Sequence, residues 1–447
     1  MNVKNSLLPA LLLAVSLGLS LLANSARAVL NIEITQGIEG AVPVAVVPFA
    51  WEATAPGAPV RPAEDIAAII SADLARTGRF ETLPPKDMLA RPHADSEINF
   101  GNWRMMGSEN LVVGTVTYQG ADRYKIRFRL FDVFKGQELF GYSQSANGND
   151  LRRAAHLISD MIYEKLTGEP GAFNTRVAYI TAQGPQKARR YSLWVADADG
   201  HNAQAMVNST EPMLSPAWSP DGTRLAYSSL EDNGHQVLFV QEVVSGRRDK
   251  VSSHKGLNGA PAWSPDGRSL ALSLSKDGNA EIYVLDLVAK KERRLTQHWA
   301  IDTEPAWTPD GQSIIFTSDR GGQPQLYQVA ADGGEVDRLT YEGAYNARAS
   351  VSPDGKQVAM IHRTDGHYRV AVLDLESGNL RVLTDGSLDE SPSFAPNGSM
   401  IIYATNSGQR GVLAAVSVDG RVRQRFSEQE GDVREPAWSP FKKLTTQ

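Results

Sequence analysis

The sequence PAWSPDG occupies residues 216–222 and returns five more times along the chain. The later copies read PAWSPDG at 261–267, PAWTPDG at 305–311, ASVSPDG at 349–355, PSFAPNG at 392–398 and PAWSPFK at 436–442. Successive copies start 45, 44, 44, 43 and 44 residues apart. A period of about 40 to 45 residues with several short strands per unit is typical of the blades of a β-propeller.

Each copy of the motif predicts a strand, a tight turn and a second strand. In Ser219-Pro220-Asp221-Gly222, proline has the φ that a type I turn needs, and glycine supplies the left-handed residue that closes a three-residue hairpin loop. Apolar segments such as 225–229 and 237–243 follow as second and third strands, and short polar segments such as 293–296 follow as fourth strands. The repeating unit is therefore a four-stranded blade.

The two ends of the repeat array together supply the four strands of one further blade. Three strand-like segments precede the first motif, at 176–181, 192–200 and 204–208, without a first strand of their own. The last motif lacks the Asp-Gly turn, and no second strand follows it. We therefore expect a six-bladed all-β propeller, closed by pairing of the C-terminal strand with the first blade, because closure removes exposed sheet edges.

The composition excludes several classes of protein. The chain has 447 residues, 42% of them hydrophobic and 21% charged, and no cysteine. Disulfides, cysteine-based zinc sites, thiol catalysis and a lipid-modified N-terminal cysteine are therefore excluded. Beyond residue 28 the chain carries 43 basic and 51 acidic residues, a balance that disfavours binding to nucleic acid.

Residues 1–28 have the pattern of a secretory signal peptide. Lys4 precedes an apolar run at 7–23, and Ala26-Arg27-Ala28 forms a small-x-small cleavage site. We expect cleavage between Ala28 and Val29, which would leave no membrane span. The alternative is an uncleaved anchor, although the run is short for a bilayer span.

A small α/β domain is expected between the signal peptide and the propeller. We predict a flexible tail at 29–40, the α/β domain at 41–170 and the propeller at 171–447. Strands are expected at 43–49, 111–118 and 124–130, with helices from about Pro62 to Gly78 and over 151–166. In the tail, apolar and polar residues alternate; from the residues alone, an edge strand of the following domain is favoured over a segment that joins a partner's sheet.

The motifs of common enzyme and metal sites do not occur. We find no Gly-x-Ser-x-Gly elbow, Walker loop, HExxH or Rossmann glycine fingerprint. His362 and His367 flank a turn, and a solvated hairpin is favoured over a metal site there. The Asp-Gly pairs are better explained as turn residues than as calcium ligands, and Trp218, Trp263, Trp307 and Trp438 as packing between blades than as a carbohydrate platform. We expect no metal and no cofactor.

The segments that lead into each motif are longer than the turns and rich in polar groups. In a propeller these segments converge on one mouth of the central channel, where polar loops on a rigid ring form a binding surface. They are residues 213–215, 257–259, 302–304, 346–348, 388–390 and 432–435.

Nearly the whole chain beyond the signal peptide resembles the TolB family, the periplasmic propeller components of the Tol-Pal system of Gram-negative bacteria. The resemblance rests on the order of the domains, the split blade and a set of shared segments. These segments are VPFAW (47–51), DLARTGRF (73–80), EKLTGEPGAFNTRVAY (164–179), SPAWSPDG (215–222), NGAPAWSPDG (258–267), TEPAW (303–307), TSDRGGQPQ (317–325), LDESPSFAPNG (388–398) and PAWSP (436–440).

The resemblance implies a non-enzymatic protein that supports outer-membrane invagination at division and outer-membrane integrity. Such proteins bind the Pal lipoprotein at the channel mouth and offer their N-terminal tail to the periplasmic domain of TolA, and colicins exploit the same site. On this sequence the implied Pal-binding residues are Leu214, Ser215, Asn258, Thr303, Glu304, Arg348, Asp389, Glu390, Arg434 and Glu435. The implied TolA-binding tail comprises Leu30, Ile32, Glu33, Ile34 and Thr35. At residue 257 a histidine of the family is replaced by leucine.

We also expect a monomer. The alternative function is a propeller hydrolase or lyase that uses carboxylates at the channel mouth, such as Glu304 and Glu390. Protease relatives with propellers carry an additional hydrolase domain, which this chain lacks after its last motif.

Overall fold

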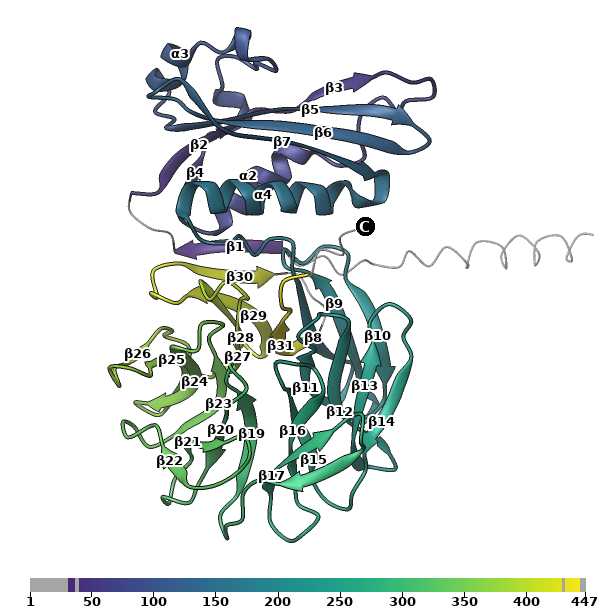
Figure 1. Cartoon of the computed structure of the whole chain (residues 1–447), viewed down its shortest axis with the longest axis vertical. Helices are drawn as coiled ribbons and strands as arrows, with labels where there is room; N and C mark the ends of the chain where they lie inside the picture. The colour runs from purple at the N-terminus through teal and green to yellow at the C-terminus, as the bar shows by residue number, and fades with distance from the viewer. Residues whose placement is uncertain (1–30, 37–39, 428–430, 443–447) are drawn as a thin grey trace, which may run out of the picture.

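The computed structural model describes residues 31–36, 40–427 and 431–442. An α/β domain lies above a β-propeller, with the C-terminal strand of the propeller next to its first strands (Figure 1). The predicted cleavage site at Ala28 and Val29, and Leu30 of the tail, lie outside the described residues. No helix within the described ranges combines the length and apolar character needed to cross a bilayer.

The α/β domain is a mixed sheet with two helices on the face nearer the propeller (Figure 1). The sheet order is β4-β2-β5-β6-β7, and β3 also pairs with β5. The strands are β2 (Val42–Val46), β3 (Ala50–Ala53), β4 (Phe80–Thr82), β5 (Asn110–Gly120), β6 (Arg123–Asp132) and β7 (Gln137–Asn147). The helices are α2 (Ile66–Arg76), α3 (Phe100–Met105) and α4 (Leu151–Thr167), with short 3-10 turns at Pro85–Asp87, Asp95–Glu97, Gly148–Asp150 and, in the propeller, Gln186–Ala188.

Local sequence signals set the ends of the two long helices. The Asp65 carboxylate accepts a hydrogen bond from the backbone N–H of Ala68 at 3.1 Å, so α2 begins after Asp65 rather than at Pro62 as predicted. Gly168 ends α4 with a φ of 77°, which glycine adopts without strain.

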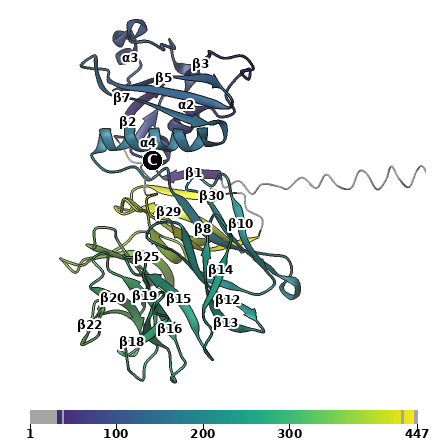
Figure 2. The same cartoon turned by 45° about the vertical axis from the view of Figure 1, so that its right-hand side comes forward.

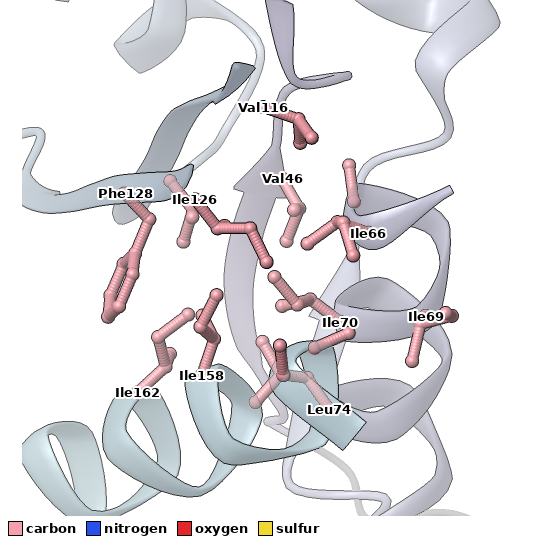
Figure 3. Packing of buried hydrophobic residues seen from close by; sticks show 14 of the residues in the cluster. Val46, Ile66, Ile69, Ile70, Leu74, Val116, Ile126, Phe128, Ile158 and Ile162 are labelled. Atoms are coloured by element: carbon pink, nitrogen blue, oxygen red, sulfur yellow. The ribbon is translucent and has the colours of Figure 1, made fainter. Parts of the chain in front are cut away.

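The core of this domain lies between the sheet and the two helices. Val46, Ile70, Ile126 and Ile158 are at most 1% exposed and meet in one apolar cluster (Figure 3). The cluster joins α2 and α4 to the sheet, and the opposite surface of the helices is left for the propeller.

The propeller has six blades of four antiparallel strands each. Five blades are continuous in sequence, and the sixth combines the last strand with the first three. In blade order, the strands are β11 (Met213–Trp218), β12 (Arg224–Asp232), β13 (His235–Glu242) and β14 (Arg248–Ser252); β15 (Asn258–Trp263), β16 (Ser269–Leu274), β17 (Glu281–Asp286) and β18 (Lys291–Arg294); β19 (Asp302–Trp307), β20 (Ser313–Ser318), β21 (Gln325–Ala330) and β22 (Val336–Arg338); β23 (Asn346–Val351), β24 (Gln357–Thr364), β25 (His367–Asp374) and β26 (Leu380–Val382); β27 (Glu390–Phe394), β28 (Met400–Ser407), β29 (Arg410–Ser417) and β30 (Arg423–Ser427); β31 (Asp432–Trp438), β8 (Arg176–Gln183), β9 (Arg190–Asp197) and β10 (Gln204–Ser209).

The predicted closure of the ring is confirmed. Strand β31 pairs antiparallel with β8, with Trp438 opposite Val177 and Ala437 opposite Ala178. Beyond the strand, the backbone N–H of Ser439 donates to the carbonyl of Arg176 at 2.8 Å, and the Ser439 hydroxyl accepts from the Arg176 N–H at 2.9 Å. The two ends of the repeat array are therefore hydrogen-bonded into one sheet.

Two of the recurring tryptophans of the repeat join neighbouring blades. The Trp218 indole N–H donates to the carbonyl of Ala437 in the closing strand at 3.0 Å, and the Trp263 indole N–H donates to Ala217 at 3.1 Å. The guanidinium of Arg176 lies 4.7 Å from the centre of the Trp218 ring, a cation–π distance. These contacts run between blades, as expected for packing residues.

The segment predicted as a flexible tail forms a strand in the structure. Strand β1 (Asn31–Gln36) pairs antiparallel with β30 and is the fifth strand at the outer edge of that blade. It lies between the propeller and the helices of the α/β domain (Figures 1 and 2). The structure thus differs from the expectation of a free segment, because the outer edge of β30 offers unpaired backbone groups that β1 satisfies.

Candidate binding mouth of the propeller

We use the term mouth for the end of the channel where the innermost strands β11, β15, β19, β23, β27 and β31 begin. The PDG turns lie at the other end, and there the side-chain amide of Asn397 donates to Pro170 of the linker at 2.9 Å. The α/β domain therefore lies on the side of the turn end, and the mouth faces away from it (Figure 1).

Every innermost strand has a bulge near the mouth. At the second, third or fourth residue of each strand a non-glycine residue has a positive φ, between 48° and 58°, and the register with the next strand shifts there. These residues, which we call the bulge ring, are Ser215, Ala260, Glu304, Arg348, Ser391 and Glu435. A bulge redirects a side chain, and a strained φ that recurs at six equivalent positions is typical of a functional site.

The sequence explains where the bulges occur. Five of the six ring residues precede a proline, which has no N–H for the strand ladder and is tolerated at bulges. All six ring residues except Ala260 have polar side chains. All six border a channel of about 530 Å³, together with the prolines and tryptophans of the motifs.

Arg348 connects the charged members of the ring across the channel. Its Nη2 lies 2.6 Å from Glu435 Oε2 and its Nη1 lies 3.1 Å from Oε1, a bidentate ion pair. Its Nε lies 3.5 Å from Glu304 Oε1, and its Nη2 also lies 3.4 Å from the hydroxyl of Ser215. One guanidinium thus joins four of the six blades.

The electrostatics of this network favour the charged forms of both partners. Burial would raise the pKa of Glu435, but Arg348 and the hydroxyl of Ser391 hold that pKa below its ordinary value of 4.5. Burial would lower the pKa of Arg348, but Glu435 and Glu304 raise it above its ordinary value. The channel therefore holds fixed charges rather than groups that titrate near neutral pH.

The remaining predicted residues at the mouth fall into two groups. Leu214 is 38% exposed, Thr303 is half-buried, and Arg434 and Glu390 form a partly exposed ion pair at 2.8 Å. Asn258 and Asp389 are at most 1% exposed. Both were predicted as contact residues, but their burial leaves no surface for a partner.

Asn258 and Asp389 instead hold the entry segments of their blades. The Asn258 side-chain oxygen accepts from the Ser252 hydroxyl at 2.8 Å and from the His254 N–H at 2.9 Å. The Asp389 carboxylate accepts from the hydroxyls of Thr384 and Thr405. Both residues position the loops that border the mouth.

The sequence analysis missed several residues at this end. Ala260 and Ser391 complete the bulge ring, and their place directly before the proline of each repeat is a signal that could have identified them. Trp299, in the segment before β19, is 77% exposed, and Tyr341, in the segment before β23, is 74% exposed. Aromatic residues such as these are enriched at protein interfaces.

The two histidines considered as metal ligands do not form a site. His362 is buried, and its Nδ1 lies 2.8 Å from the Asn346 side-chain oxygen, while burial lowers the pKa of His362. His367 is exposed and begins β25, just after the hairpin turn, where it pairs with Thr364, whereas His362 pairs with Arg369. In the described part of the chain, the residues that could surround an ion are Asp73, His156 and Asp199, far from the mouth.

The predicted tail residues lie along β30 rather than near the mouth. By Cα pairing, Ile32 is opposite Phe426, Glu33 is opposite Arg425 and Ile34 is opposite Gln424. The Thr35 hydroxyl donates to the carbonyl of Arg423 at 3.2 Å. The tail and the mouth are thus separate surfaces of the molecule.

The structure defines a class, a closed propeller with an N-terminal α/β domain and an open mouth. The model of the TolB beta propeller domain matches residues 163–442, and the model of the TolB amino-terminal domain matches residues 30–139. The chain therefore belongs to the TolB family, as its motifs predicted, and this supports a non-enzymatic role in the Tol-Pal system.

Individual relatives agree with this assignment. The chain is 60% identical over 417 residues to a Tol-Pal system protein TolB of Nitrosococcus oceani, covering 93% of this chain and 94% of the relative. It is 58% identical over 435 residues to that of Thioalkalivibrio sulfidiphilus, covering 97% and 99%. The crystal structure of TolB from Acinetobacter baumannii matches with a TM-score of 0.84 and 41% identity, covering 92% of this chain and all of that chain.

Proposed function

We propose that this protein is a periplasmic scaffold of the Tol-Pal system that binds Pal at the mouth and TolA through the segment at 31–36. The observation that supports the Pal site best is the bulge ring, a set of six residues with positive φ that border the channel at its mouth, on the end away from the α/β domain. A preformed surface of this kind loses little conformational entropy when it binds, so its contacts contribute to affinity rather than to ordering.

The proposed Pal site combines exposed and fixed groups. Leu214, Thr303 and the Arg434–Glu390 pair offer accessible surface, while Arg348 and its carboxylate partners provide fixed charges inside the opening. Trp299 and Tyr341 add aromatic area around it. Aromatic and arginine side chains are the residues that most often dominate the energy of protein interfaces.

We expect Leu214→Glu to weaken binding of the soluble domain of Pal by about tenfold or more, which corresponds to about 1.4 kcal/mol. The reason is that a carboxylate would be desolvated at the rim of the interface. Isothermal titration calorimetry on the chain from residue 29 onward measures the change.

Val288→Glu is the matched control for this variant. Val288 is 82% exposed and lies in the turn between β17 and β18, at the end of the blade remote from the mouth. The same charge placed there should leave the affinity unchanged. Equal affinities of both variants and the parent would show that Pal, if it binds, does not use the mouth.

The proposed TolA site is the tail. Because β1 is an edge strand, it has one row of backbone groups free of β30, and it is held by a single neighbour. Such a strand can pair with a partner's sheet or leave β30 to do so. A chain that starts at Gly40 should lose binding to the periplasmic domain of TolA and keep binding to Pal, as measured by calorimetry with both partners. Retained TolA binding would place that site elsewhere.

The alternative of a hydrolase or lyase finds less support at the mouth. The Glu304 carboxylate accepts from the Thr317 hydroxyl at 3.0 Å and from the Arg348 N–H at 3.1 Å, and Glu390 is paired with Arg434. Carboxylates engaged in this way are poor candidates for a general base. We therefore propose a binding role, in support of outer-membrane invagination and integrity, for a monomer whose mouth colicins can also exploit.

A further inference from the structure

A buried charged cluster lies where the α/β domain meets the propeller. It contains Asp73 of α2, His156 of α4 and Asp199 of the turn between β9 and β10. The His156 Nδ1 lies 2.7 Å from Asp73 Oδ2, and the Nε2 lies 3.3 Å from Asp199 Oδ2. The imidazole therefore stands between two carboxylates, one from each domain.

Because the cluster is buried, its charge state affects how well its members fit together. The side chains of His156 and Asp73 are 3% and 1% exposed, and that of Asp199 is 11% exposed. Nδ1 is hydrogen-bonded to Asp73, whereas Nε2 meets Asp199 as an ion-pair contact without hydrogen-bond geometry. Only the imidazolium carries a proton on both nitrogens and so attracts both carboxylates. A neutral ring would leave one carboxylate facing an acceptor nitrogen in a buried site.

Other charged groups surround the imidazole on every side. Arg152, one turn before His156 on α4, forms an ion pair with the same Asp199 oxygen, and its Nη2 lies 2.9 Å from His201 Nδ1. Arg76 of α2 pairs with the other oxygen of Asp73 at 3.2 Å. The further titratable groups near the cluster are Asp160 on α4, Asp197 on β9, and Asp150, Arg153, Arg176 and Lys442 around the neighbouring cavity.

The geometry favours an ion-pair network over a metal site. Asp73, His156 and Asp199 each offer a ligand atom within 4.8 Å of the others. However, the Asp199 oxygen nearest the ring is already bound by the Arg152 guanidinium, and Arg76 engages Asp73. A divalent cation would have to displace or oppose both guanidinium groups.

We propose that protonated His156 links the two domains electrostatically, and that loss of its proton lets the α/β domain move relative to the propeller. The imidazolium of His156 links the domains because its two carboxylate partners, Asp73 and Asp199, belong to different domains. When His156 loses its proton, Asp73 keeps Arg76 and Asp199 keeps Arg152, but the lone pair of Nε2 then faces the Asp199 carboxylate in a buried site. This repulsion would weaken the contact between α4 and the propeller.

The electrostatics set the pH range of this effect. Burial alone would lower the pKa of His156, but Asp73 and Asp199 raise it to about 9 from 6.5. A group with a raised pKa stabilises the folded arrangement fully below its ordinary value, and the stabilisation is lost as the pH rises through the folded value. The electrostatic link through His156 should therefore be present at neutral pH and lost in alkaline solution.

Spin labels on the two domains test the proposal directly. The chain has no cysteine, so Val60→Cys and Val244→Cys introduce the only two thiols. Val60 is 97% exposed in the α/β domain, and Val244 is 96% exposed in the propeller, so labels should not disturb either fold. Pulsed electron paramagnetic resonance then gives the distribution of distances between the domains.

We expect a narrow distribution at about pH 7 that becomes about twice as wide at about pH 10.5. The midpoint should coincide with the titration of the His156 imidazole followed by NMR. His156→Gln should give the wide distribution at both pH values. Asp199→Asn changes the propeller side of the contact and keeps the shape of the side chain. It should also give the wide distribution at both pH values, and it replaces His156→Gln as the test if that variant does not fold.

His201→Gln is the matched control, because His201 contacts the same aspartate from within the propeller and is 43% exposed at its side chain. Its distribution should follow that of the parent. A narrow distribution for a folded His156→Gln at neutral pH would overturn the proposal, as would a narrow distribution for Asp199→Asn, which removes the contacts of both His156 and Arg152. So would widening of the parent distribution while the His156 ring is still protonated.

Discussion

Ending the chain at Gly431 is expected to abolish the folded propeller, at a cost of more than about 5 kcal/mol, which is comparable to the whole stability of many domains. The truncation removes β31, and with it the innermost strand of the closing blade. Val433 and Ala437, at 2% and 9% exposed, would leave the core, and the edge of β8 would be open. The acceptor of the Trp218 indole N–H would also be lost.

Urea unfolding followed by far-ultraviolet circular dichroism measures this effect. A chain ending at Lys442 is the control, since it also loses C-terminal residues but keeps β31 and the contacts of Ser439. It should unfold like the full-length protein. If the chain ending at Gly431 gave the same midpoint and slope, the terminal strand would not hold the ring closed.

Replacing Arg348 by alanine is expected to cost about 3 to 5 kcal/mol, because Glu435 would remain buried without its cation. The side chain of Glu435 is only 13% exposed, so water can replace the lost partner only in part. Arg434→Ala is the matched control. Arg434 and Glu390 are 42% and 33% exposed, and such a pair contributes at most about 1 kcal/mol.

The pH dependence of the same variant separates charge from packing. In the parent protein the pKa of Glu435 lies below 4.5, so this pair stabilises the fold above that pH and is lost as the pH falls through the lower, folded value. In Arg348→Ala, burial without a cation should raise the pKa, so the variant loses stability as the pH rises. The difference between the two proteins should therefore be large at pH 7 and should shrink in acid. A constant difference would assign the effect to packing alone.

Closure of the ring could be predicted because the expected strands can be counted along the repeats. The repeat period is long and regular, and three strands without a first strand at one end match a first strand without successors at the other. The turn residues Pro220, Asp221 and Gly222 are also local signals, since their backbone angles are set by their own side chains. Both features are properties of sequence neighbours.

The mouth was predictable only in outline. The segments that border it follow from the repeat, but the inward aim of Arg348 and Glu435 depends on the register shift at the bulge, which a following proline marks for Glu435 and not for Arg348. Asn258 and Asp389 resemble exposed loop residues in sequence, and their burial follows from hydroxyl partners on neighbouring strands. Polar residues in loops cannot be assigned to contact or support without these partners.

Contacts between the domains could not be predicted from the sequence. The pairing of β1 with β30 joins segments about 390 residues apart, as the hydrogen bond from Thr35 to Arg423 shows with a separation of 388. Likewise, His156 meets Asp199 only because α4 rests on the turn end of the propeller. Neither the alternation of the tail nor the helical periodicity of α4 carries information about the surface that each element meets.

Amide hydrogen exchange, read by mass spectrometry on peptides covering 432–438 and 176–183, tests the closed ring most directly. In a ring closed by β31, both peptides should be protected to the same extent as the central strand β16, because their backbone groups are hydrogen-bonded to each other. Rapid exchange of the 432–438 peptide beside a protected β16 would mean that the last strand does not join the first blade.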